Sequence, residues 1–117
     1  MQNETKAQLE LLTSPHPVAV LRFEGDIAST SKDVLLSTYQ SIPPDSHSKV
    51  VLDFTQVDYI NSSGIALVIQ LLIEATNAGQ MLSICGLSPH FAKVFTMVGI
   101  PKYAALFPTR AEALAAL

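Results

Sequence analysis

The sequence predicts an α/β fold with a mixed β-sheet of four to five strands packed against about four helices. Short apolar runs typical of strands alternate along the chain with segments whose apolar residues recur every three or four positions, as in helices. Prolines, glycines and N-capping residues separate these segments. Hydrophobic residues make up 49% of the 117 residues, which fits one core and one domain over residues 1–117.

The first two strands are expected to pair as a hairpin. Residues 7–13 alternate weakly between apolar and polar side chains, and residues 18–24 do so more clearly. One face of the first strand is expected to hold Leu9 and Leu11, and one face of the second to hold Ala19, Leu21 and Phe23. Two prolines within residues 14–17 predict a turn between the strands. The Gly-Asp pair at 25–26 is expected to end the second strand.

A helix and a central strand are expected next. Ser29, Thr30 and Ser31 are candidate N-caps, and Thr30 with Asp33 has the spacing of a capping box. The helix after them has apolar residues at helical spacing, namely Leu35, Tyr39 and Ile42. Prolines at 43–44 are expected to stop it. Residues 49–54 form a short apolar run rich in β-branched side chains, which is typical of a central strand.

The second half of the chain predicts a helix, a buried strand and a helix, then a short edge strand and a last helix. Their expected ranges are 64–78, 80–85, 89–98, 103–106 and the residues after 109. Ser88 before a proline, and Thr109 with Glu112, are expected N-caps of the last two helices. Gly79 is expected to end the helix before residue 80, and Gly99 the helix that Ser88 opens.

Composition excludes several classes of function. The net charge of −3 and the lack of any basic stripe argue against direct nucleic-acid binding. A lone cysteine, Cys85, allows no internal disulfide and suits a reducing compartment. Residues 1–6 lack the apolar run of a signal peptide, and the longest apolar stretch, 65–73, is too short to span a bilayer. We therefore expect a cytoplasmic protein, and its oligomeric state stays open.

The residue pattern predicts that the chain is not an enzyme. Ser62 and Ser63 lack the flanking glycines of a nucleophile elbow. The three histidines are scattered and Cys85 has no partner cysteine, so no metal site or cofactor is expected. Asp53, near the end of a central strand, resembles the phosphoacceptor of receiver domains, but the acidic pair and the lysine that those domains need are missing or misplaced. The alternative is that Asp53 anchors a turn or loop.

Two adjacent hydroxyls lie between the central strand and the next helix. Ser62 and Ser63 could simply cap that helix, or they could be exposed acceptors of a phosphate. A phosphoserine adds about −1.5 to −2 charges, which a helix N-terminus favours by roughly 0.3–1 kcal/mol. Burying that dianion against an apolar partner is unfavourable by several kcal/mol. A phosphate here would therefore block an interface without unfolding the domain.

The helix after these serines is unusually apolar. Its expected core stripe is Ile65, Val68, Ile69 and Leu72. Three further residues extend the apolar surface beyond that stripe, namely Leu67, Leu71 and Ile73. The pattern favours a partner interface on this helix. The alternative is a helix buried on one side by the sheet and on the other by a neighbouring helix.

Three segments resemble a known family. Residues 51–65, which include the Asn-Ser-Ser-Gly turn, are similar to the signature of STAS domains, specifically the stand-alone bacterial anti-sigma factor antagonists. The resemblance continues through residues 79–86 and 91–99 and covers nearly the whole chain. It implies a STAS-type sheet and a single STAS domain over residues 1–117.

The resemblance also implies a mechanism. The unphosphorylated antagonist would bind an anti-sigma factor, which is itself an ATP-dependent serine kinase, and so regulate sigma-factor-dependent transcription. The kinase would phosphorylate the second serine, Ser63, and release the antagonist, and a serine phosphatase would reverse this. The implied partner-binding residues are Asp26, Ala28, Asn61, Ser62, Ser63, Gly64, Leu67 and Leu71.

The sequence departs from the family pattern at two positions. Many members have an aspartate where Asn61 stands and an acid where Ala28 stands. Asn61 is still an expected helix cap. An alternative function is a STAS scaffold or a soluble accessory subunit of a stress-signalling or lipid-transport assembly, without a phosphorylation switch.

Overall fold

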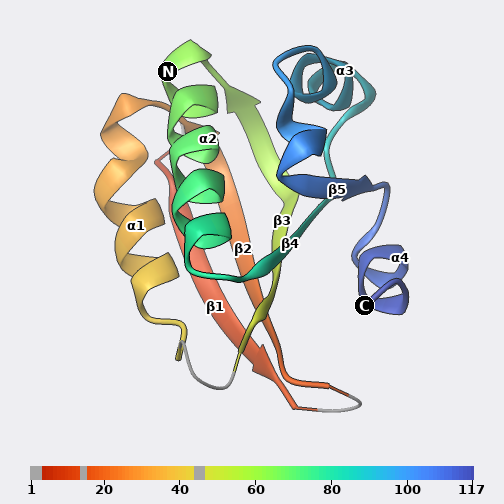
Figure 1. The fold of residues 1–117 in the computed structure, drawn as a ribbon. Coiled ribbons are helices and arrows are strands. Elements are labelled where there is room, and N and C mark those ends of the chain that lie inside the picture. Colours follow the sequence, from red (N-terminus) through yellow and green to blue (C-terminus); the bar gives the residue numbers. More distant parts are fainter. Residues whose placement is uncertain (1–3, 14–15, 44–46) are drawn as a thin grey trace.

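The computed structural model describes residues 4–13, 16–43 and 47–117 (Figure 1). These residues form the strands β1 (Lys6–Leu12), β2 (Val18–Ile27), β3 (Lys49–Ile60), β4 (Met81–Cys85) and β5 (Ala104–Phe107). They also form the helices α1 (Lys32–Gln40), α2 (Ser62–Asn77), α3 (Pro89–Met97) and α4 (Arg110–Ala115), and the 3-10 turns η1 (Ser29–Ser31) and η2 (Ile100–Lys102).

The strands form one mixed sheet in the order β1-β2-β3-β4-β5. The β1–β2 pair is antiparallel, as the predicted hairpin requires, and every other neighbouring pair is parallel. The predicted α/β class, with five strands and four helices among the described residues, is therefore confirmed.

The two faces of the sheet are covered by different helices (Figure 1). On one face α1, α2 and Phe95 of α3 pack on the larger core, in which the ring of Phe54 lies between Phe23 at 5.3 Å and Phe95 at 5.8 Å. On the other face α4 packs on a smaller cluster that includes Val20 and Val51. Successive strand residues point to opposite faces, so the apolar run of a central strand supplies both cores.

Two strands are longer than predicted. The Gly-Asp pair at 25–26 does not end β2, which continues to Ile27, and β3 continues six residues beyond the predicted end at Phe54 to Ile60. The two extensions pair with each other as far as Ile27 and Ile60, with register shifts that begin after Arg22. Each extension therefore supplies the other's hydrogen-bond partners, and a glycine at a bulge is compatible with strand continuation.

Of the three candidate N-caps of the first helix, Ser31 holds that position, but the predicted capping box is wrong. Residues Ser29–Ser31 form a 3-10 turn, and the N-cap of α1 is Ser31, without a side-chain cap. Its hydroxyl instead accepts the backbone N–H of Ala28, so the Thr30–Asp33 capping box does not form. The helix ends at Gln40, before the predicted stop, while Ile42 is buried as expected. Residues 14–15 of the predicted turn and residue 44 lie outside the described residues.

The C-terminal elements agree closely with the prediction. Ser88 caps α3 by accepting the N–H of Phe91, and Thr109 caps α4 by accepting the N–H of Glu112. The edge strand β5 begins one residue later than predicted. Gly79 and Gly99 follow α2 and α3 with φ of 80° and 89°, a conformation that suits a glycine after a helix.

Candidate functional site

The turn between β3 and α2 is capped by Asn61 and not by the serines that follow it. Asn61 has an extended backbone, and its side-chain Oδ1 accepts the N–H of Gly64 at 2.8 Å. This confirms the predicted cap. The backbone N–H of Asn61 donates to the carbonyl of Ile27 at 3.1 Å, so the turn is fixed to the end of β2.

Gly64 lies directly on that same carbonyl. A Cβ added at Gly64 would be 2.2 Å from the Ile27 oxygen, closer than any real contact. Gly64 is therefore buried and structural, because only a residue without a side chain lets α2 approach the end of β2 this closely. Its predicted role as a partner contact has little accessible surface to support it.

Ser62 and Ser63 are the first two residues of α2, and both are exposed. Neither hydroxyl makes a hydrogen bond to a residue that the structure describes. Because Asn61 already caps the helix, the serines are not needed as caps, and the predicted alternative in which they only cap α2 is wrong. The backbone N–H groups of a helix start have no intrahelical acceptor, so this end of α2 favours negative charge.

The loop after β2 lies beside the serines but exposes other residues than those predicted. Asp26 and Ala28 are 9% and 6% exposed, so their side chains offer little to a partner. The exposed residues of this loop are Ser29 and Thr30. The sequence did not show which residues of this 3-10 turn are exposed, because that depends on the elements that pack against the turn.

The predicted interface on α2 also needs correction. Leu67 and Leu71, predicted to bind a partner, are 9% and 1% exposed and belong to the larger core. The buried stripe of α2 is Gly64, Leu67, Val68, Leu71, Leu72 and Ala75. Ile65 and Ile69, predicted for the core, are only half-buried, and Ile73 is 40% exposed. The buried stripe of α2 is therefore rotated about the helix relative to the predicted one, and it leaves isoleucines accessible on its other side.

An exposed aromatic cluster lies at the end of β3 and was missed by sequence reasoning. Tyr59 is 52% exposed, and its ring contacts that of Phe91 edge-on at 6.0 Å. The His90 ring also contacts the Phe91 ring edge-on, with 5.0 Å between their centroids. A tyrosine among polar residues just before the serine turn was the available signal.

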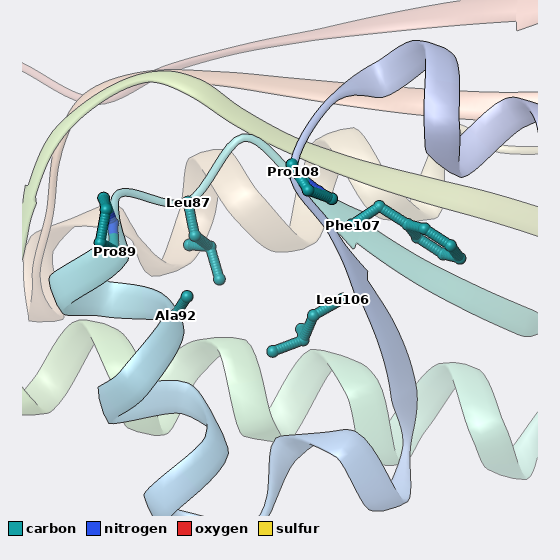
Figure 2. A pocket seen from close by; sticks show the side chains of 6 residues that line it. All are labelled: Leu87, Pro89, Ala92, Leu106, Phe107 and Pro108. Carbon is teal, nitrogen blue, oxygen red and sulfur yellow. The ribbon is translucent and has the colours of Figure 1, made fainter.

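A separate apolar pocket lies between the start of α3 and the end of β5 (Figure 2). It has a volume of about 290 Å³, and Leu87, Ala92 and Leu106 point into it. Its other lining residues are Pro89, Phe107 and Pro108. No titratable side chain lines it, so it offers no acid–base chemistry.

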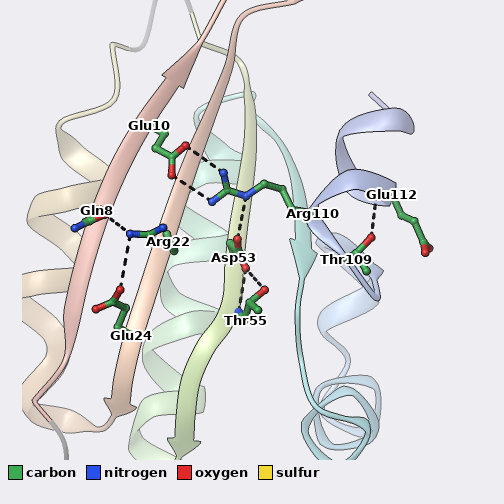
Figure 3. Close-up of polar contacts among 9 residues, drawn as sticks. All are labelled: Gln8, Glu10, Arg22, Glu24, Asp53, Thr55, Thr109, Arg110 and Glu112. Carbon is green, nitrogen blue, oxygen red and sulfur yellow. Dashed lines mark hydrogen bonds and ion pairs between the residues drawn. The ribbon is translucent and has the colours of Figure 1, made fainter.

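Asp53 is a structural anchor rather than an exposed phosphoacceptor (Figure 3). One carboxylate oxygen accepts the Thr55 N–H at 2.9 Å, and the other accepts Arg110 Nε at 3.0 Å. Burial alone would raise the pKa of Asp53, but the Thr55 hydrogen bonds and the Arg110 guanidinium outweigh it and hold the pKa below its ordinary value. Arg110 also binds Glu10 at 3.1 Å. These bonds join α4 to β1 and β3, so Asp53 anchors a helix to the sheet and not the turn or loop that the alternative predicted.

Other chemistries find little support in the described part of the chain. Burial, with Asp53 nearby, raises the pKa of Cys85 to about 12, so this thiol is not a nucleophile at neutral pH. No group of three or more His, Cys, Asp or Glu residues among the described residues could hold a metal ion. Within the same residues, no helix has the length and apolar character needed to cross a membrane.

The mixed sheet, the Ser-Ser-Gly turn at the start of α2 and the separate C-terminal helix together define a STAS domain. A model of the STAS domain family matches residues 9–113, and the chain belongs to that family. It is similar to BtrV of Bordetella bronchiseptica, which has the provisional name of an anti-sigma factor antagonist, with 27% identity over 85 residues, 73% of this chain and 71% of BtrV.

Solved structures share the fold. An anti-sigma factor antagonist from Mycobacterium paratuberculosis matches with a TM-score of 0.79 and 19% identity, over 97% of this chain and 93% of that one. The Bacillus cell fate determinant SpoIIAA in its phosphorylated form matches with a TM-score of 0.68 and 22% identity, over 93% and 96% of the two chains.

Proposed function

We propose that this protein is an anti-sigma factor antagonist that binds an anti-sigma factor with serine kinase activity and is released when Ser63 is phosphorylated. The observation that supports this most directly is the cap geometry. Asn61 caps α2, so the exposed Ser63 hydroxyl is not needed as a cap and makes no hydrogen bond to another described residue. The similarity to BtrV, and to a SpoIIAA structure solved in a phosphorylated form, supports the same proposal.

The partner surface proposed here differs from the one expected from sequence. It consists of Ser62 and Ser63, the exposed loop residues Ser29 and Thr30, and the half-buried Ile65 on the next turn of α2. Leu67 and Leu71 support it from beneath as core residues. Asn61 contributes by fixing the turn and not by charge.

A phosphate on Ser63 acts on the complex and not on the fold. The start of α2 favours the added charge by roughly 0.3–1 kcal/mol in the free protein. Against an apolar partner the same dianion is unfavourable by several kcal/mol unless it is paired. A penalty of about 3 kcal/mol weakens binding on the order of 100-fold. A serine phosphatase would restore binding, in a cytoplasmic cycle that controls sigma-factor-dependent transcription.

The test is capture of partners from native lysate with the wild type, Ser63→Ala and Ser63→Glu, with phosphate mapped on the recovered wild type by mass spectrometry. We expect the wild type and Ser63→Ala to retain a kinase-type anti-sigma factor and Ser63→Glu to lose it. Gln70→Glu is the matched control: it adds the same charge at an exposed position of α2 outside the proposed surface, and it should retain the partner.

Two results would contradict the proposal. One is equal capture of the partner by all variants, with no phosphate on either serine. This favours the alternative of a scaffold or accessory subunit without a switch. The other is phosphate on Ser62 alone, which would move the acceptor to the neighbouring residue.

A further inference from the structure

The loop between β2 and α1 is held by two hydroxyl groups, those of Ser31 and Thr5. Ser31 is 1% exposed, and its Oγ accepts the N–H of Ala28 at 2.9 Å, while its own N–H donates to the Ala28 carbonyl at 2.9 Å. Thr5 Oγ1 contacts Ser31 Oγ and donates to the carbonyl of Asp26.

One arrangement of protons satisfies these groups together. Ser31 donates its hydroxyl proton to Thr5, Thr5 donates its own to the Asp26 carbonyl, and Ser31 accepts from Ala28. In the reverse order Thr5 donates to Ser31, which donates to the same Asp26 carbonyl at 3.5 Å. The two hydroxyls, one from Thr5 just before β1 and one from Ser31 in η1, therefore fix the backbone on both sides of residue 27.

Residue 27 is the point at which this loop contacts the serine turn. The Ile27 carbonyl accepts the N–H of Asn61 at 3.1 Å and is the atom on which Gly64 packs. Hydrogen bonds are directional, so fixing Asp26 and Ala28 fixes where this carbonyl points. The position of the turn before Ser63 thus depends on the hydroxyls of Thr5 and Ser31, which are distant from the turn in the sequence.

We infer that Ser31 and Thr5 are positioning residues for Ser63. They hold the Ile27 carbonyl, and through it the Asn61–Gly64 turn and the exposed residues Ser29 and Thr30, in one geometry. The effect on a kinase that acts at Ser63 rests on the function proposed above. The coupling between the loop and the turn does not depend on any partner.

Amide hydrogen exchange in the isolated protein tests the coupling. In Ser31→Ala we expect roughly tenfold faster exchange at Ala28 and at Asn61, the size expected for loss of one buried hydrogen bond. Amides of the central strands, such as Leu52, should be unchanged. Ser29→Ala is the control, because Ser29 is an exposed serine of the same 3-10 turn. Unchanged exchange at Asn61 in Ser31→Ala overturns the coupling.

Thr5 offers a matched pair. Thr5→Val removes the hydroxyl at nearly constant shape and should accelerate exchange at Asn61, whereas Thr5→Ser keeps the hydroxyl and should behave as the wild type. If both variants accelerate exchange equally, packing and not the hydroxyl positions the loop, and the inference fails for Thr5.

The second measurement is phosphorylation of Ser63 by the anti-sigma factor recovered with the wild type, in the presence of ATP. We expect kcat/KM to fall roughly tenfold in Ser31→Ala and to be unchanged in Ser37→Ala, because Ser37 is an exposed serine of α1 outside the proposed partner surface. Faster exchange with an unchanged kcat/KM overturns the positioning role and leaves the proposed function intact. A wild type that is not phosphorylated overturns the proposed function and this positioning role together, while the exchange data still decide the coupling.

Discussion

The guanidinium of Arg110 lies 3.0 Å from the carboxylate of Asp53 and joins α4 to the centre of the sheet. Asp53 is buried, and Arg110 approaches it from the face opposite α1 and α2 (Figure 3). We expect Arg110→Ala to lower the free energy of unfolding by about 1–3 kcal/mol, because it leaves a buried carboxylate with only the Thr55 hydrogen bonds. Urea denaturation measures this.

The second partner of Arg110 provides the control. The Glu10 side chain is 38% exposed, so its ion pair with Arg110 is screened by water. We expect Glu10→Gln to change the free energy of unfolding by less than about 1 kcal/mol. If Glu10→Gln costs as much as Arg110→Ala, the surface pair holds α4 and the buried pair does not.

The lowered pKa of Asp53 predicts a pH dependence of stability. A carboxyl group whose folded pKa lies below its unfolded pKa contributes stability above the unfolded pKa and loses it as pH falls through the folded pKa. The loss should therefore begin near pH ~4 and continue below it. The wild type should exceed Asp53→Asn in stability at neutral pH, and the gap should narrow in acid. A gap that stays constant across that range would count against Asp53.

The class and order of the elements could be predicted from sequence because each depends on local periodicity and capping. The lengths of β2 and β3 could not, because residues 55–60 are largely polar and form a strand only through the pairing that ends at Ile27 and Ile60. The local sequence of neither segment indicates that the two segments pair with each other.

The candidate site shows the same division. Asn61 was predicted as a cap from its residue type and place, and it is one. The buried stripe of α2 was placed wrongly because apolar residues surround this helix, so several stripes fit equally well. The small residues Gly64 and Ala75 mark the side that approaches the sheet, and their size was the signal that could have selected the right stripe.

Gly64→Ala should destabilise the protein although alanine is the better helix former. The added methyl would lie 2.2 Å from the Ile27 oxygen, and the overpacking should outweigh a propensity gain of up to about 1 kcal/mol, for a net loss of about 2 kcal/mol. Ala66→Gly, at an exposed position of the same helix, is the reverse control and should cost about 1 kcal/mol through propensity alone. A Gly64→Ala protein more stable than the wild type in urea would sink this account.

Cys85 should resist alkylation in the native protein. With a pKa of about 12 it holds almost no thiolate at neutral pH, and its side chain is fully buried. We expect iodoacetamide to modify it only at the rate at which the protein opens, and rapidly in concentrated urea, as followed by mass spectrometry. Val98→Cys, at a position that is 48% exposed, provides an accessible thiol in the same protein. Similar native rates for the two thiols would contradict the prediction.

Charge at Ser63 should change stability slightly and in a fixed order. At the second position of α2, Ser63→Glu should be more stable than Ser63→Lys by roughly 0.3–1 kcal/mol, and high salt should reduce the difference. The order should reverse at the exposed Asn77, which ends the same helix, so Asn77→Lys should be more stable than Asn77→Glu. Urea denaturation of all four variants measures both differences.

A Ser63→Glu protein that loses more than about 2 kcal/mol would contradict the dipole argument, and its failure to bind a partner would then reflect unfolding. If the expected order holds, loss of the partner by Ser63→Glu acts at the interface, because the fold itself accepts the charge.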